Sequence, residues 1–165
     1  MKKQSLTIEY SSFQSIKNLD NENQKLIEKC KEAIKKAYSP YSKFSVGAAL
    51  LLDDGTIIEG NNQENVAYPS GLCAERVALF YASAKYPNKI VKKIAISAKK
   101  NHSSQKTPIV SPCGACRQVM VETEIKQKEP ITIILFGEEG NGIIFESINS
   151  LMPFAFDISK IIQND

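Results

Sequence analysis

The chain has 165 residues, of which 42% are hydrophobic and 24% charged, and its net charge is +3. These values fit a single soluble globular domain with one core, and no apolar run is long enough to cross a membrane. The N-terminus also lacks the apolar stretch of a signal peptide, so we expect a cytoplasmic protein with no membrane partner.

The excess of lysine does not predict a nucleic-acid partner. The densest basic pairs are residues 92–93 and 99–100, and no aromatic residue lies between them. A groove for nucleic acid usually combines clustered basic residues with stacking aromatic rings. We therefore interpret these lysines as a solvated face.

Residues 1–19 are expected to form a polar N-terminal extension, followed by one domain over residues 20–165. In the extension, apolar residues within 6–10 predict a short strand, either at a sheet edge or as an arm onto a neighbouring subunit. Asp20 can cap a helix. We expect that helix to end near Tyr38, because the residue before a proline avoids the α region.

Apolar runs bounded by turn residues predict five strands and a short helical region at residues 150–162. An Asp-Asp-Gly turn at residues 53–55 indicates that the first two strands form an antiparallel hairpin. The five strands are expected at residues 46–52, 56–59, 91–98, 131–136 and 143–145.

Two further helices are expected to begin at Cys73 and next to Cys113. Apolar residues follow each cysteine at helical spacing, and Pro112 stands where proline favours a helix start. Helices alternating with strands predict an α/β fold, a three-layer α/β/α sandwich with a mixed five-stranded sheet. The N-termini of both helices are expected at one end of that sheet, where α/β folds usually bind ligands.

Cysteines at these helix starts predict a metal site. The positive end of a helix dipole stabilises a thiolate, which is the form that binds zinc. Cys113 and Cys116 are spaced to hold one metal, and Cys73 supplies a third ligand. Three protein ligands leave one tetrahedral position open, which is typical of a catalytic zinc site. Glu75, two residues after Cys73, is the natural base for water in that position.

A Cys-x-x-Cys pair alone also fits a redox pair or half of a zinc ribbon. A ribbon needs a fourth ligand, for which the candidates are Cys30 and His102. Cys30 falls on the apolar face of the first predicted helix and is interpreted as a core residue. His102 lies in a polar run that predicts a solvated loop.

The residues Cys73-Ala74-Glu75 and the segment from Pro112 to Cys116 resemble the signature of the small zinc-dependent cytidine deaminases that act on free nucleosides. The resemblance implies one zinc ion per subunit and Glu75 as the catalytic acid and base. It also implies hydrolysis of cytidine and 2′-deoxycytidine to uridine and 2′-deoxyuridine in pyrimidine salvage. The N-terminal extension lies outside the resemblance.

Other segments match the same family. The resemblance places Phe44 against the pyrimidine or sugar, and Asn62 and Glu64 on the ribose hydroxyls. A surface loop with turn formers is the plain alternative for residues 60–65. Arg76 is expected to donate to the thiolates and offset their charge, because zinc with three thiolates carries a net charge of about −1.

The resemblance also implies a homotetramer with active sites shared between subunits. Phe156, in a segment similar to the family's C-terminal motif, is expected to reach a neighbouring site, although a role in core packing fits equally well. Tyr68 matches a segment at subunit contacts, and Tyr68 and Ala74 are included among the substrate-binding residues.

Three other functions remain open from the sequence. A blasticidin-type deaminase is disfavoured by the segment Asn62 to Asn65, which that type lacks. An RNA or single-stranded DNA deaminase commonly carries His where this chain has Cys73, together with basic and aromatic channels. A non-catalytic zinc module would need a fourth protein ligand.

Overall fold

The sheet is built on two long central strands, β2 (Phe44–Leu52) and β4 (Val91–Lys100), which pair antiparallel. Their side chains alternate between two cores. Ala48 and Leu50 face one core, whereas Ala49 and Leu51 face the other. A strand covered on both faces reads as a continuous apolar run, which explains why this segment lacks a polar face.

The computed structural model describes residues 1–157 and has a six-stranded mixed sheet in the order β1-β6-β5-β4-β2-β3. β4 and β5 are parallel, and the other neighbours are antiparallel. The mixed α/β architecture is confirmed, but the expected count of five strands is wrong. The remaining strands are β1 (Ser11–Phe13), β3 (Ile57–Asn61), β5 (Thr132–Phe136) and β6 (Gly142–Phe145).

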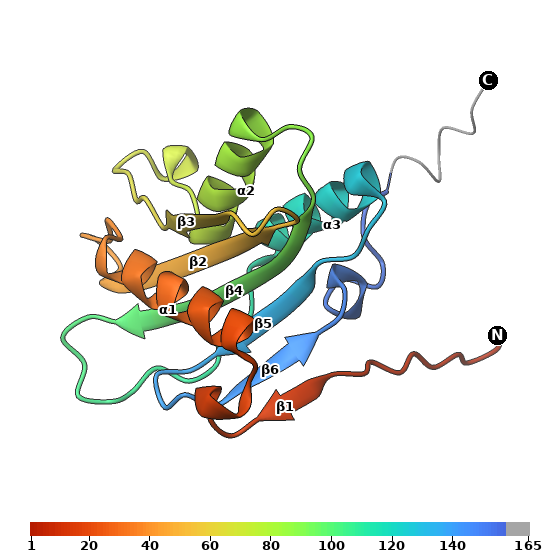
Figure 1. Cartoon of the computed structure of the whole chain (residues 1–165), viewed down its shortest axis with the longest axis horizontal. Helices are drawn as coiled ribbons and strands as arrows, with labels where there is room; N and C mark the ends of the chain where they lie inside the picture. The colour runs from red at the N-terminus through yellow and green to blue at the C-terminus, as the bar shows by residue number, and fades with distance from the viewer. Residues whose placement is uncertain (158–165) are drawn as a thin grey trace.

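Helices cover both faces of the sheet (Figure 1). α1 (Asn21–Lys35) packs on one face, and α2 (Ala74–Lys85) and α3 (Gly114–Gln127) pack on the other. Three short 3₁₀ turns complete the described elements. They are η1 (Ile16–Asn18), η2 (Tyr68–Ser70) and η3 (Ile148–Ser150).

Asp20 caps α1 as the sequence predicts: its Oδ1 accepts from the Asn23 N–H at 2.8 Å. The helix ends at Lys35 and not near Tyr38. The Tyr38 N–H instead donates to the Asn62 carbonyl at 3.0 Å, which draws the chain away from the helix axis. The tertiary contact therefore ends the helix before the proline does.

The sixth strand lies in the N-terminal extension. A strand was expected over residues 6–10, but the structure has β1 at Ser11–Phe13, paired antiparallel with β6. Phe13 is buried over Gly142, where an added Cβ would lie 2.2 Å from the Phe13 ring. The alternation in residues 6–10 was misleading, since Leu6 and Ile8 are exposed. The end of the extension thus joins the sheet and its core.

The C-terminal helical region expected over residues 150–162 is not present over residues 151–157, where turns follow η3. The rest of that expectation lies outside the described residues. No helix within residues 1–157 is both long and apolar enough to span a membrane.

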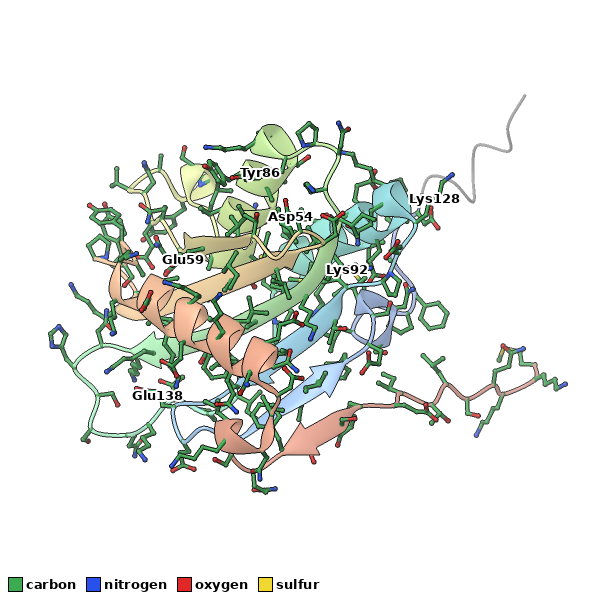
Figure 2. The ribbon with its side chains drawn as sticks, viewed as in Figure 1. Asp54, Glu59, Tyr86, Lys92, Lys128 and Glu138 are labelled. Atoms are coloured by element: carbon green, nitrogen blue, oxygen red, sulfur yellow. The ribbon has the colours of Figure 1, made fainter. Side chains whose placement is uncertain are left out.

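Three of the four lysines of β4 contact carboxylates, and two members of these ion pairs, Lys92 and Glu138, are labelled in Figure 2. Lys92 pairs with Glu129, Lys93 Nζ lies 2.7 Å from Glu22 Oε1, and Lys99 Nζ lies 3.7 Å from Glu138 Oε1. The positive charge of Lys92, Lys93 and Lys99 is therefore offset locally.

Phe13→Ala should lower the free energy of unfolding by about 3 kcal/mol, because it removes a buried ring from the core between α1 and the sheet. The measurement is a urea unfolding curve of the full chain. Leu6→Ala is the matched control, because Leu6 is 59% exposed; its effect should stay within about 0.5 kcal/mol. Equal effects of the two substitutions would contradict the placement of β1.

Candidate active site

The site lies where α2 and α3 begin. β3 and β4 are both antiparallel to β2, so they run in the same direction. The chain leaves both strands at the same end of the sheet and then enters α2 and α3. Two segments far apart in the sequence therefore present helix N-termini side by side, as expected from the order of elements.

Three sulfurs meet at these helix starts. Cys73 is the N-cap of α2, Cys113 is the N-cap of α3, and Cys116 lies in the first turn of α3. Neither N-cap sulfur accepts a capping hydrogen bond from its own helix. Cys73 Sγ lies 3.8 Å from Cys113 Sγ, which lies 3.4 Å from Cys116 Sγ.

This sulfur cluster fits one zinc ion. All three sulfurs lie within 4.8 Å of one another, and all are free thiols. A tetrahedral zinc site with Zn–S bonds of about 2.3 Å separates its sulfurs by about 3.8 Å. Within residues 1–157 the cluster has no fourth His, Cys, Asp or Glu ligand. A closed zinc ribbon is therefore not formed by the described part of the chain.

The two other ligand candidates lie elsewhere, as the sequence predicts. Cys30 is fully buried beneath β2, and its Sγ donates to the Gly47 carbonyl at 3.2 Å. His102 is exposed in the turn after β4. Neither contributes to the sulfur cluster.

Arg76 contacts the cluster directly. Its Nη2 donates to Cys73 Sγ at 3.8 Å. A hydrogen bond from Cys116, together with that from Arg76, lowers the pKa of Cys73 to about 5. The bond to Cys73 and burial raise the pKa of Cys116. Of Cys73 and Cys116, Cys73 therefore ionises more readily, and the guanidinium of Arg76 lies beside it.

Glu75 is buried beside the cluster and is only 3% exposed. Burial raises the pKa of its carboxyl group, and the charge of Cys73 adds to that effect. Its Oε2 and the Nε of Arg76 are buried and have no hydrogen-bond partner among the described residues. Unpaired buried polar atoms are rare and costly, and in a cleft they are typical of functional sites.

A cavity of about 510 Å³ opens over Cys73, Glu75 and Cys113. This volume is in the range of pockets for small organic molecules. The start of β2 and the middle of β4 supply apolar residues to its wall. Its other lining residues include Phe44, Val46, Asn62, Glu64, Tyr68, Ile96, Val110 and Ser111.

Asn62 and Glu64 line the cavity, but both already bond to this chain. Asn62 Oδ1 accepts from the Val46 N–H at 2.8 Å, and its Nδ2 donates to the Phe44 carbonyl at 2.9 Å. Glu64 accepts from the Ser42 hydroxyl and from the Tyr41 N–H, the latter at 2.9 Å. These two residues therefore also hold the segment that carries Phe44 in place.

The remaining predicted residues divide into two groups. Phe44 and Tyr68 line the cavity, and Tyr68 is 78% exposed at its rim. Neither Ala74 nor Phe156 lines the cavity: Ala74, the first residue of α2, is fully buried, and Phe156 is 65% exposed. Sequence reasoning missed Val110 and Ser111. Their position just before the Pro112 motif was the available signal.

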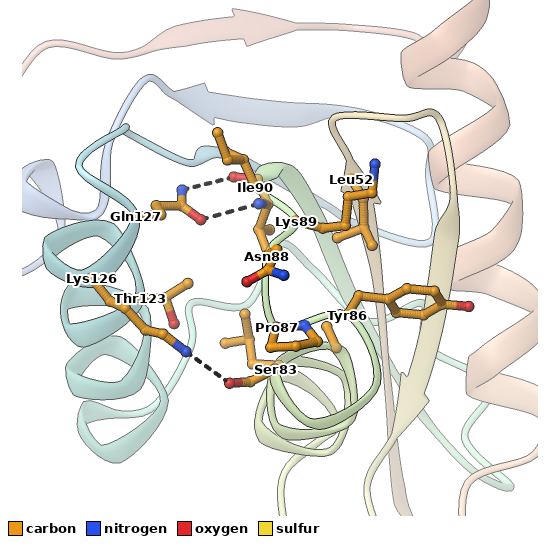
Figure 3. Close-up of a pocket in the computed structure, with 13 residues that line it drawn as sticks. Leu52, Ser83, Tyr86, Pro87, Asn88, Lys89, Ile90, Thr123, Lys126 and Gln127 are labelled. Carbon is orange, nitrogen blue, oxygen red and sulfur yellow. Dashed lines mark hydrogen bonds between the residues drawn. The ribbon is translucent and has the colours of Figure 1, made fainter.

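A second cavity, of about 270 Å³, lies at the opposite ends of α2 and α3 (Figure 3). Its polar groups bond to their neighbours: Lys126 Nζ donates to Ser83 Oγ at 3.3 Å, and Gln127 bonds both backbone groups of Val91 at 3.0 Å. Within residues 1–157, the only metal-ligand cluster is that of the three cysteines. The first cavity, which is lined by Cys73 and Cys113, is therefore the candidate active site.

An α/β sandwich with three cysteines and a buried glutamate at two helix N-termini defines a zinc-dependent enzyme centre. The family model for the cytidine and deoxycytidylate deaminase zinc-binding region matches residues 20–129. The chain belongs to this family, which confirms the resemblance seen in the sequence and the zinc assignment.

Relatives agree with this membership. The chain is 48% identical over 135 residues to the cytidine deaminase of Halalkalibacterium halodurans, covering 82% of this chain and 94% of the relative. A cytidine deaminase of Sporosarcina psychrophila is 50% identical over 99 residues, covering 60% and 68%. The crystal structure of the Burkholderia pseudomallei cytidine deaminase matches with a TM-score of 0.69 and 40% identity, covering 80% of this chain and 97% of that one.

The protein should bind one zinc ion per chain, and Cys113→Ala should lose it, because two thiolates hold zinc far more weakly than three. Elemental analysis after gel filtration measures the stoichiometry. Cys30→Ala is the matched control and should keep one zinc. Loss of zinc from the Cys30 variant, or retention by the Cys113 variant, would contradict the ligand set.

Proposed function

We propose that the protein hydrolyses cytidine and 2′-deoxycytidine to uridine and 2′-deoxyuridine with release of ammonia. The reaction forms a C–O bond from water to C4 of the pyrimidine and breaks the C–N bond to the exocyclic amine. The observation that carries this proposal is the unpaired Oε2 of Glu75, which is buried in the same cavity as Cys73 and Cys113.

Cys73, Cys113 and Cys116 would hold the zinc ion. Zinc bound there supplies Lewis acidity, which makes water acidic enough to lose a proton near neutral pH. As in zinc deaminases generally, Glu75 then takes the proton of the attacking water and passes it to ring N3. The carboxylate then takes the second proton, from the new hydroxyl on C4, and delivers it to the departing amine as ammonia leaves, so one side chain serves as both base and acid.

Arg76 would offset the charge of the metal site. Three thiolates leave a bound zinc ion with a net charge of about −1, which weakens it as a Lewis acid. The guanidinium donates to Cys73 Sγ at 3.8 Å. This contact withdraws negative charge from the ligand nearest to Glu75 in the sequence.

The nucleoside would lie with its base over the metal site and its sugar toward Asn62 and Glu64. Each polar group keeps bonding capacity, because the Asn62 amide has a second hydrogen and the Glu64 carboxylate further lone pairs. Phe44 would pack against the base or sugar and Tyr68 would contact the substrate from the rim, whereas Ala74, predicted as a substrate-binding residue, is fully buried and does not line the cavity. Both proposed nucleosides carry the 3′-hydroxyl that such a site can bind.

We further propose a cytoplasmic role in pyrimidine salvage. The four cysteines are free, and free thiols are typical of a reducing compartment. Uridine and deoxyuridine are free nucleosides, which salvage reactions can use.

The single domain, which also includes β1 of the N-terminal extension, would assemble as a homotetramer. Tyr68, Phe154 and Phe156 are 78%, 90% and 65% exposed, so these three rings are accessible to a neighbouring subunit. Phe156 does not line the cavity of its own chain, so we propose that it contacts substrate in a neighbouring subunit.

Glu75→Gln should lower kcat for cytidine by about 10²- to 10⁴-fold, because the amide cannot take or return the proton. The measurement is ammonia release by zinc-loaded protein, with zinc content determined on the same sample. Glu122→Gln on the exposed face of α3 is the control and should keep wild-type turnover. Near-normal turnover by the Glu75 variant would remove Glu75 from the mechanism.

Phe156→Ala should raise KM for cytidine while the protein stays tetrameric, because the substitution removes a ring from the neighbouring site but not a metal ligand. Light scattering gives the oligomeric state, and initial rates give KM. A fully active monomer, or an unchanged KM in a tetramer, would contradict the shared site.

A further inference from the structure

Cys113 is the ligand that packing holds least. It is exposed, whereas Cys116 is buried and Cys73 is half-buried. The next residue, Gly114, has no atom within 4 Å of the position where a Cβ would stand. Side-chain packing therefore does not explain why the Cys113 sulfur points at the other two. Pro112, just before Cys113, is buried, so this segment is held by the packing of that residue and by hydrogen bonds to its backbone.

Arg117 supplies those bonds. Its backbone N–H donates to the Cys113 carbonyl at 2.9 Å, as the first hydrogen bond of α3. Its side chain turns back toward the helix N-terminus. There its Nε donates to the Pro112 carbonyl at 2.8 Å, and its Nη1 donates to the Leu151 carbonyl at 2.8 Å.

We propose that Arg117 is a positioning residue of the metal site. The Pro112 carbonyl belongs to the peptide bond that leads into Cys113, so a fixed donor on it sets the direction from which Cys113 enters the cluster. The other arm of the guanidinium bonds the C-terminal segment. Arg117 thus clamps the ligand loop to the end of the fold without touching a sulfur.

The planar guanidinium is essential to this geometry. It presents donors at fixed directions and can bond two carbonyls at once, whereas a lysine ammonium is a single compact donor group. Arg76 differs from Arg117 because it donates to the Cys73 sulfur itself. The two arginines therefore support the same cluster in different ways, one by charge and one by backbone geometry.

The neighbouring residue gives a matched control. Gln118 Nε2 donates to the Phe156 carbonyl at 2.7 Å, so it tethers the same C-terminal segment. Within residues 1–157, no hydrogen bond joins the Gln118 side chain to Pro112 or Cys113. A variant at Gln118 loosens the C-terminal segment and leaves the ligand loop clamped.

The experiment measures the rate at which zinc leaves the full-length, zinc-loaded protein to an excess of a chromophoric chelator. Arg117→Ala should release zinc about 10- to 100-fold faster than the wild type, the usual range for residues that support metal ligands. Arg117→Lys should fall between them. Gln118→Ala should stay within about twofold of the wild type, since the ligand loop is unchanged.

Circular dichroism during the chelator reaction shows whether zinc leaves a folded protein. If Arg117→Ala does not fold, Arg117→Lys decides the question, because it keeps the aliphatic stem and the charge. The positioning role of Arg117 would be overturned if the Arg117 variants released zinc at the wild-type rate, or if Gln118→Ala released it as fast as Arg117→Ala. Either result would leave the zinc site itself in place. The inference rests on the proposed zinc site, so a wild type without zinc would overturn both.

Discussion

The structure depends on holding three thiol groups within 4.8 Å of one another. Thiolates at that separation repel strongly unless positive charge lies between or beside them. The fold supplies two helix N-termini, whose dipoles favour negative charge, and the guanidinium of Arg76. Zinc completes the neutralisation. The N-termini of α2 and α3, the cavity and Glu75 all lie around this cluster.

The sheet satisfies the requirement through its strand directions. Because β3 and β4 run in the same direction on the two sides of β2, the segments that follow them start at the same end of the sheet. Close packing then brings α2 onto the sheet. An added Cβ on Gly60 of β3 would lie 2.4 Å from the Ala74 carbonyl, so only glycine lets the turn that carries Glu75 approach so closely.

Local patterns predicted most of the elements and the metal ligands. The Asp20 cap, the Asp-Asp-Gly hairpin and the cysteine spacing each depend on residues near one another in the sequence, so the sequence alone is informative. β1 was misplaced because pairing with β6 depends on a long-range fit between Phe13 and Gly142. The cavity wall at Val110 was missed for a similar reason: the preceding loop is held by Glu138, which accepts from the Thr107 N–H at 2.8 Å.

The central claim is that this cavity deaminates nucleosides, and a direct test is the ultraviolet absorbance change on adding zinc-loaded protein to four substrates. These are cytidine, 2′-deoxycytidine, cytosine and a short cytosine-bearing oligonucleotide. We predict turnover of the two nucleosides and little of the free base, because a site built to bond a sugar hydroxyl rejects ligands that lack it. Turnover of the oligonucleotide instead, or of none of the four with zinc bound, would contradict the claim.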